Sequence, residues 1–100
     1  MTLVNTFTVA PDRADELLSV LTEATEQVMR HIPGFVSANL HLSDDRRHVI
    51  NYAQWASRED FDAMLTREDA REHMGRAKEI AESFHPIICE LLFSDEKTVS

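Results

Sequence analysis

Apolar and polar residues alternate with period two along three stretches of the chain. These stretches cover residues 3–9, 35–42 and 48–56, and each is rich in β-branched and aromatic residues, which is typical of half-buried β-strands. The turn-forming sequence 43–46 separates the second and third stretches, so these two are predicted to form an antiparallel hairpin. A last strand is predicted over residues 87–93, because this stretch is apolar on both faces.

Three helices are predicted between the strands. The first begins at Pro11, carries apolar residues at spacings of three and four, and ends at Pro33-Gly34. Ser57-Arg58-Glu59-Asp60 and Thr66-Arg67-Glu68-Asp69 each resemble a capping box with Asp in place of Glu, so a short helix and a longer one are predicted to begin there. The longer helix is expected to bury Ala70, Met74, Ala77, Ala81 and Phe84, with Pro86 beyond its end.

The predicted order is strand, helix, strand, strand, two helices, strand. This is the split βαβ order of the ferredoxin-like fold, an α+β architecture in which one four-stranded antiparallel sheet carries its helices on one face. With 100 residues, 43% of them hydrophobic, the chain is expected to form one domain over 1–100. Residues 94–100 are mainly polar and are expected to form a loosely held tail.

The sheet face away from the helices is predicted to be mixed in character. It should carry Phe35, Ser37, Asn39, His41, His48, Ile50, Tyr52 and Gln54. Such a face is too polar for a core and too aromatic for plain solvent, and a domain of this size buries only about two-thirds of its unfolded surface. We therefore expect a homodimer in which the two sheets pack face to face.

Charge and composition exclude several kinds of partner. The formal charge of −8 and the lack of a Lys/Arg run argue against nucleic acid and against anionic membrane surfaces. No apolar run approaches the length of a membrane span, and the first residues lack a basic segment followed by a long apolar one, so a cytoplasmic location is expected. Cys89 is the single cysteine, so neither an intramolecular disulfide nor a thiolate cluster is expected. His41 and His48 could oppose each other on the outer face, but the pattern places no third ligand beside them, so no metal site is predicted.

The helix-facing side of the sheet carries the candidate functional residues. Alternation places Asn51 and Trp55 there beside Val49 and Ala53, and in the predicted strand order Asn5 lies on the neighbouring strand. Burying amides and an indole N–H is unfavourable unless they find partners, so the group is either a set of satisfied structural bridges or a pocket. In a pocket, amide N–H groups could stabilise an oxyanion and the indole could stack on a planar aromatic molecule.

Four further residues are candidates for contact with a bound molecule. Small Ala38 leaves space near Asn51. His73 could accept a phenolic proton, and the alternative is a hydrogen-bonded structural histidine. Arg76 could close the pocket mouth or pair with an anionic substrate, and the alternative is a solvated surface arginine. Phe61 has the position of an ordinary core residue.

Two stretches of the chain resemble a known family. Ile32-Pro33-Gly34-Phe35-Val36-Ser37-Ala38 and Asn51-Tyr52-Ala53-Gln54-Trp55 are similar to sequences of the antibiotic biosynthesis monooxygenases, which are small dimeric α+β barrel proteins. The likeness is greatest to the quinone-forming members of actinorhodin biosynthesis. By this resemblance, Asn51 and Trp55 match the family's catalytic Asn and Trp, and Asn5 matches a first-strand Asn that helps to hold the substrate. Arg76 falls within one position of an active-site Arg, and Phe61 stands where the related enzyme has a Tyr.

The resemblance implies a reaction and two alternatives to it. The reaction is the oxidation of an anthrone or polycyclic phenol to a quinone, with dioxygen as co-substrate and no flavin, haem or metal. The first alternative is haem degradation by related dimeric barrels, in which Asn5 and His73 would fit an Asn and a His while Met64 stands near the position of a Trp. The second is a non-catalytic dimeric barrel that binds a small apolar ligand.

Overall fold

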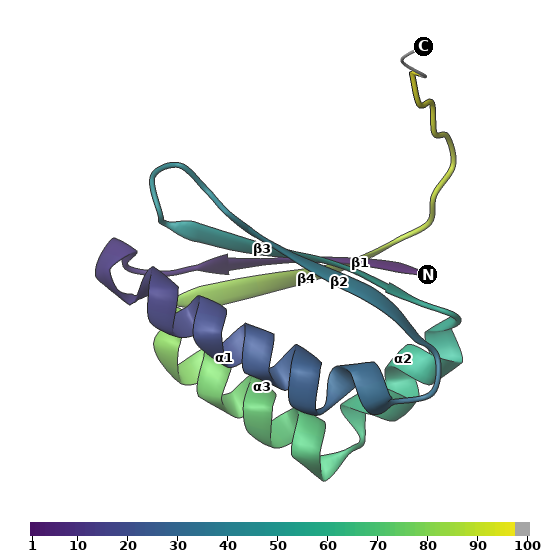
Figure 1. Ribbon diagram of the computed structural model, residues 1–100, viewed down its shortest axis with the longest axis horizontal. Helices are drawn as coiled ribbons and strands as arrows, with labels where there is room; N and C mark the ends of the chain where they lie inside the picture. The colour runs from purple at the N-terminus through teal and green to yellow at the C-terminus, as the bar shows by residue number, and fades with distance from the viewer. Residues whose placement is uncertain (98–100) are drawn as a thin grey trace.

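The helices of residues 1–97, the part of the chain that the computed structural model describes, pack against one face of a four-stranded sheet (Figure 1). The strands are β1 (Thr2–Thr8), β2 (Phe35–Leu42), β3 (His48–Trp55) and β4 (Ser83–Cys89). The helices are α1 (Ala14–Gln27), α2 (Arg58–Leu65) and α3 (Glu68–Ile80), with short 3-10 turns η1 (Pro11–Arg13) and η2 (Met29–His31) flanking α1. The strand order is β2-β3-β1-β4 and every pairing is antiparallel. The predicted ferredoxin-like arrangement is confirmed.

Two apolar clusters hold the helices on the sheet. One is centred on Leu17, Val9 and Val49, each with 0% of its surface exposed, and it holds α1 and α3 on the end of the sheet where β1 ends and β3 and β4 begin. The other joins the end of β3 to α2. The predicted first helix is interrupted, because Val28 leaves the helical conformation (φ −123°, ψ −65°) and η2 follows it. None of the helices in residues 1–97 is long and apolar enough to cross a bilayer.

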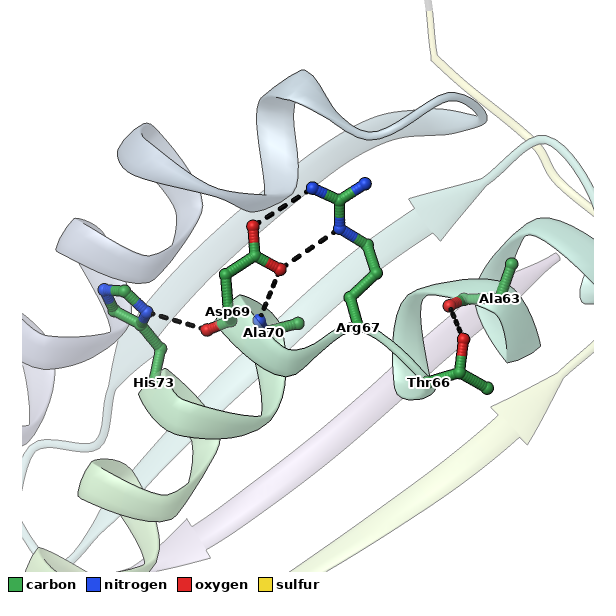
Figure 2. A network of polar contacts seen from close by, with 6 residues as sticks. All are labelled: Ala63, Thr66, Arg67, Asp69, Ala70 and His73. Atoms are coloured by element: carbon green, nitrogen blue, oxygen red, sulfur yellow. Dashed lines mark hydrogen bonds and ion pairs between the residues drawn. The ribbon is translucent and has the colours of Figure 1, made fainter.

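Only one of the two predicted capping boxes exists. At the start of α2, the Ser57 hydroxyl accepts a hydrogen bond from the Asp60 backbone N–H at 3.1 Å, as predicted. The second prediction is wrong, because the Thr66 hydroxyl instead donates to the Ala63 carbonyl at 2.7 Å and satisfies the last turn of α2 (Figure 2). The residue that precedes α3 is Arg67, whose side chain makes no capping bond.

The longer helix ends, and the last strand begins, at earlier positions in the chain than predicted. Helix α3 ends at Ile80, Ala81 is extended (φ −75°, ψ 142°), and β4 runs from Ser83 to Cys89 rather than over 87–93. Phe84 belongs to the strand, where its ring centroid lies 6.2 Å from that of Phe7. Pro86 is tolerated inside β4 because an edge strand has one neighbour and can lack one N–H.

The chain after β4 runs away from the helices (Figure 1). Leu91, Leu92 and Phe93 lie in this segment and are 70%, 86% and 82% exposed. Residues 94–97 have no regular secondary structure. The rest of the predicted tail, residues 98–100, lies outside the described residues.

A β-bulge reverses the predicted directions of two side chains at the start of β2. Phe35 pairs with Trp55 and Ser37 with Gln54, so Val36 is an extra residue in the ladder. Phe35 consequently packs against Trp55 on the helix-facing side, the opposite of the prediction, and Val36 is 57% exposed, whereas strict alternation with Phe35 would turn it toward the helices. Beyond the bulge the predicted alternation holds.

The register of the hairpin also separates the two outer histidines. His41 is paired with Ile50, and His48 is paired with Thr8 of β1. The expectation that His41 and His48 oppose each other is therefore wrong.

Gly34 joins the entry of β2 to the start of α2. Its φ of +90° lies in the region that favours glycine, and its carbonyl accepts a 2.7 Å hydrogen bond from the N–H of Ala56. A Cβ atom at this position would collide with the side chain of Asp60. Both the backbone conformation and the close contact therefore require glycine.

Replacing this glycine should destabilise the fold, and the chain offers a matched control. Gly34→Ala should lower the free energy of unfolding by about 1–3 kcal/mol because of strain at positive φ. Gly75 lies inside α3, where an added Cβ atom would point into open space, so Gly75→Ala should raise the free energy of unfolding by about 0.5–1 kcal/mol. Urea denaturation followed by circular dichroism measures both values. Equal effects of the two substitutions would contradict this role for Gly34.

Candidate active site

A cavity of about 400 Å³ lies between the sheet and the three α-helices. Most of its lining is apolar, and its volume is within the range of roughly 300–1,000 Å³ that is usual for small-molecule sites. The polar groups that reach it come from separate elements: Asn5 from β1, Thr25 from α1, Asn51 and Trp55 from β3, Arg58 from α2 and His73 from α3. The fold thus gathers a few polar groups in a largely apolar space.

The two amides face each other across neighbouring strands. Asn5 and Asn51 are direct partners in the β1–β3 pairing, and Asn5 is only 8% exposed. The side-chain oxygens of both are buried, and within residues 1–97 neither has a hydrogen-bond partner. An unsatisfied buried polar group is rare and costs about 1–3 kcal/mol. For the two amide oxygens, this geometry contradicts the alternative of satisfied structural bridges.

Trp55 is held in one orientation by its neighbours. It is 4% exposed, and Phe35 and Phe61 meet its ring edge-on, with centroid distances of 5.5 and 6.2 Å. Its backbone is fixed as well, because its N–H donates to the Met1 carbonyl at 3.0 Å and its carbonyl accepts from the Met1 amino group at 3.1 Å. The indole is therefore a preorganised part of the cavity wall.

His73 points one ring nitrogen along its own helix. Its Nδ1 lies 3.0 Å from the Asp69 carbonyl oxygen (Figure 2), and since a carbonyl only accepts, this nitrogen carries a proton. In the neutral imidazole, Nε2 is then the nitrogen that can accept one. The half-buried ring lines the cavity, so His73 can act as a base toward a molecule bound there.

An ion pair steadies the turn that holds His73. Arg67 donates from Nε and Nη2 to the Asp69 carboxylate at 3.1 and 3.0 Å, and the Ala70 N–H donates to it at 2.8 Å (Figure 2). The hydrogen bond from Arg67 holds the pKa of the Asp69 carboxyl below its usual value. Asp69 is ionised at neutral pH, and because the pair is exposed, it orients the first turn of α3 without holding it strongly.

The other predicted contact residues divide into two groups. Ala38 and Phe61 line the cavity, and Ala38 lies opposite another small residue, Ala53, in the β2–β3 pairing. Arg76 does not line it, because its Nη2 lies 3.5 Å from a Glu23 carboxylate oxygen, in an exposed ion pair between α3 and α1.

Two polar residues of the cavity were not predicted. Thr25 lies one helical turn after Leu21 on the apolar stripe of α1, and its hydroxyl donates to the Leu21 carbonyl at 3.0 Å. Helical spacing alone could have placed it on the buried face. Arg58 follows Trp55 by three residues, but a charged side chain in the first turn of a helix normally points to solvent, and no sequence pattern marks it.

Comparison with known proteins agrees with this geometry. The model of the antibiotic biosynthesis monooxygenase family matches residues 1–76. The tetracenomycin-F1 monooxygenase of Streptomyces glaucescens is 45% identical over 93 residues, which are 93% of this chain and 82% of that protein.

Solved structures agree on the fold. A putative antibiotic biosynthesis monooxygenase from Bacteroides thetaiotaomicron superimposes with a TM-score of 0.79 at 18% identity, covering 98% of this chain and 94% of that one. SnoaB, a cofactor-independent oxygenase from Streptomyces nogalater, superimposes with a TM-score of 0.78 at 21% identity, covering 94% and 96%. Together with the match of the family model and the 45% identical relative, this shows that the chain belongs to the antibiotic biosynthesis monooxygenase family.

Proposed function

We propose that this monooxygenase oxidises an anthrone or a related polycyclic phenol to a quinone with dioxygen, without flavin, haem or metal. The observation that carries the proposal is the pair of partnerless amide oxygens, Asn5 and Asn51, in an apolar cavity beside Trp55. Two names among the similar proteins support it: one acts on tetracenomycin F1, and the other is a cofactor-independent oxygenase.

The cavity suits a flat aromatic molecule. Its walls are mostly apolar, so a fused ring system would exchange water for apolar contacts on both faces. The indole of Trp55 offers an extended surface for stacking. Ala38 and Ala53 are small and leave space above the middle of the sheet, close to the amides.

The first chemical step is deprotonation of the substrate. His73 Nε2 accepts the proton, from the phenol or from the carbon between the rings. The resulting phenolate or enolate is stabilised by the amide N–H groups of Asn5 and Asn51, since rotation of an amide by half a turn presents its NH₂ group instead of its oxygen. Low polarity around these donors strengthens the interaction.

The substrate supplies the electrons for dioxygen. The anion transfers one electron to dioxygen, and the resulting radical and superoxide combine to form a peroxide at the ring carbon. The peroxide takes up a proton, and its O–O bond then breaks with loss of water, whose hydrogens are this proton and the second hydrogen of the ring carbon, so that a carbonyl group remains. The overall change is CH₂ plus O₂ giving C=O plus H₂O. The protein has to bind, orient and deprotonate the substrate and to keep bulk water away.

Asn5 and His73 line the cavity and would also fit the haem-degrading alternative, but the third residue that this alternative needs is missing. The alternative requires an aromatic residue near the position of Met64, and Met64 is a core residue of α2 with 4% of its surface exposed. We therefore develop the reaction on polycyclic phenols.

The amides should matter for activity and not for stability. Asn51→Leu and Asn5→Leu should each lower kcat/KM by about 100-fold through the loss of an oxyanion donor. The melting temperature should stay the same or rise, because each substitution removes a buried oxygen without a partner. Dioxygen uptake by metal-free protein with a simple anthrone, corrected for autoxidation, measures the rate. Gln27→Leu, at an exposed amide residue of α1, is the control, and a loss of stability with unchanged rate would refute the proposed role of the amides.

The histidine should contribute through proton transfer. His73→Gln should lower kcat by about 100-fold. The remaining rate should increase with pH, because hydroxide then acts as the base in place of the imidazole. His31→Gln changes an exposed histidine of η2 and should leave the pH–rate profile unaltered. If the profiles of wild type and His73→Gln coincide, then His73 is not the base.

We also propose that two copies pair through the outer face of the sheet. Tyr52 and Ile87 lie on that face and are 40% and 55% exposed, and the exposed apolar segment 91–93 follows β4. A second copy would remove this surface from water, which supplies burial that a small domain lacks.

A charge placed on this face should separate the copies. Light scattering should give twice the mass of the chain for the wild type and the single mass for Tyr52→Asp, since an unpaired carboxylate is unfavourable in an interface. Thr22→Asp places the same charge on the exposed surface of α1 and should remain a dimer. A monomeric wild type at micromolar concentration would overturn the proposal.

A further inference from the structure

We propose that Arg58 binds a carboxylate group of the substrate at the mouth of the cavity, so that the preferred substrates are polycyclic phenols that carry an acid substituent. This inference rests on the proposed function, because it assigns a substrate class to the same cavity. It concerns a residue that neither the sequence pattern nor the family resemblance singled out.

Arg58 lies between two hollows of the molecule. Besides the internal cavity, a surface groove of about 580 Å³ runs past the N-terminus and the end of β4. Three residues line both spaces, namely Trp55, Arg58 and Ile88. These residues separate the groove from the cavity, and Arg58 is the one of the three with a charge.

Arg58 is the one charged side chain that residues 1–97 contribute to the cavity wall. The chain has 18 acidic and 10 basic residues, yet Arg58 is the one Lys, Arg, Asp or Glu among the described residues that line the internal cavity. In the groove it is accompanied by Glu90, which is exposed and therefore well screened by water. Among residues 1–97, Arg58 is consequently the one positive side chain that a ligand in the cavity can meet, with the Asp62 carboxylate paired to the far side of its guanidinium group at Nε.

The guanidinium group has donors left for a ligand. Its Nε donates to the Asp62 carboxylate at 3.0 Å, one turn along α2. The two Nη atoms have no partner among the hydrogen bonds of residues 1–97. The two Nη atoms form the fork that binds a carboxylate through two parallel hydrogen bonds. The pair with Asp62 is exposed, at 60% and 54% of the two side chains, so it orients the guanidinium without holding it strongly.

This position would also set the direction in which the substrate lies. A carboxylate held at the mouth leaves the fused rings to extend inward past Trp55, toward the amides on the sheet. A substrate without the acid group would keep the ring contacts but lose this anchor, so it could bind in more than one orientation. Arg58 is thus a specificity-determining and positioning residue in this proposal.

Binding of a matched pair of ligands tests the inference. Anthraquinone-2-carboxylate and its carboxamide have the same rings and differ in charge, and the chain has a single tryptophan, Trp55, whose fluorescence quenching reports occupancy. The wild type should bind the acid about 10- to 100-fold more tightly than the amide. Arg58→Gln should abolish this preference, and Arg58→Lys should restore part of it. Arg71→Gln, which removes an exposed arginine of α3, should keep the full preference.

The outcomes separate this inference from the proposed function. Equal affinity of the wild type for the two ligands, or a preference that survives in Arg58→Gln, would overturn the role of Arg58, even if the wild type oxidises an unsubstituted anthrone. Conversely, a preference that depends on Arg58, in a protein that oxidises no anthrone, would support the carboxylate site and reject the proposed reaction. Unchanged melting temperatures of the variants would show that these effects are local.

Discussion

The pairing of β1 with β3 is the constraint on which the candidate site depends, because it sets Asn5 directly against Asn51. In a sheet, a shift of one residue would turn every side chain of β1 to the other face. The shift is prevented by Leu3 and Phe7, which flank Asn5 on the same face and are 7% and 6% exposed. Apolar burial therefore fixes the register, and the two polar amides are carried into the interior by their apolar neighbours on the strand.

The cavity and its two amides lower the stability of the fold. A hollow of about 400 Å³ in a chain of 100 residues removes contacts that would otherwise stabilise the core, and two partnerless amide oxygens add a further penalty of about 1–3 kcal/mol each. These terms are large against the roughly 5–15 kcal/mol by which domains are stable. The fully buried cluster around Leu17, Val9 and Val49 compensates for part of this loss. A bound substrate or a second copy would add to stability in the same way.

The periodicity of the sequence predicted which side chains of the strands are buried, but not the features of the backbone that depend on contacts between distant parts of the chain. Alternation correctly placed Asn5, Asn51 and Trp55 on the helix-facing side, because it reports directly which face of a strand is buried. It could not predict the bulge at Val36, because the residues around one extra residue still alternate in a way that fits either face of the sheet.

The boundary between α3 and β4 was also missed. Ala81 and Phe84 continue the helical spacing of α3, so nothing local ends the helix at Ile80. What ends it is the free edge of β1, whose Thr8 carbonyl accepts a hydrogen bond from the Glu82 N–H at 2.8 Å as β4 begins. A partner that lies more than seventy residues away in the chain leaves no periodic signal near Ile80.

Two irregular parts of the backbone, Gly34 and the bulge at Val36, lie together at the entry of β2. Gly34, at positive φ, contacts Asp60 near the start of α2 and binds Ala56, and the bulge that follows it turns Phe35 onto Trp55. These features tie the entry of β2 to the turn that presents Arg58. The regular pairing of β1 with β3, in contrast, forms the floor with the two amides. Changes around Arg58 would therefore alter which molecules bind while the chemistry of the floor stays intact, because the two parts are held by different interactions.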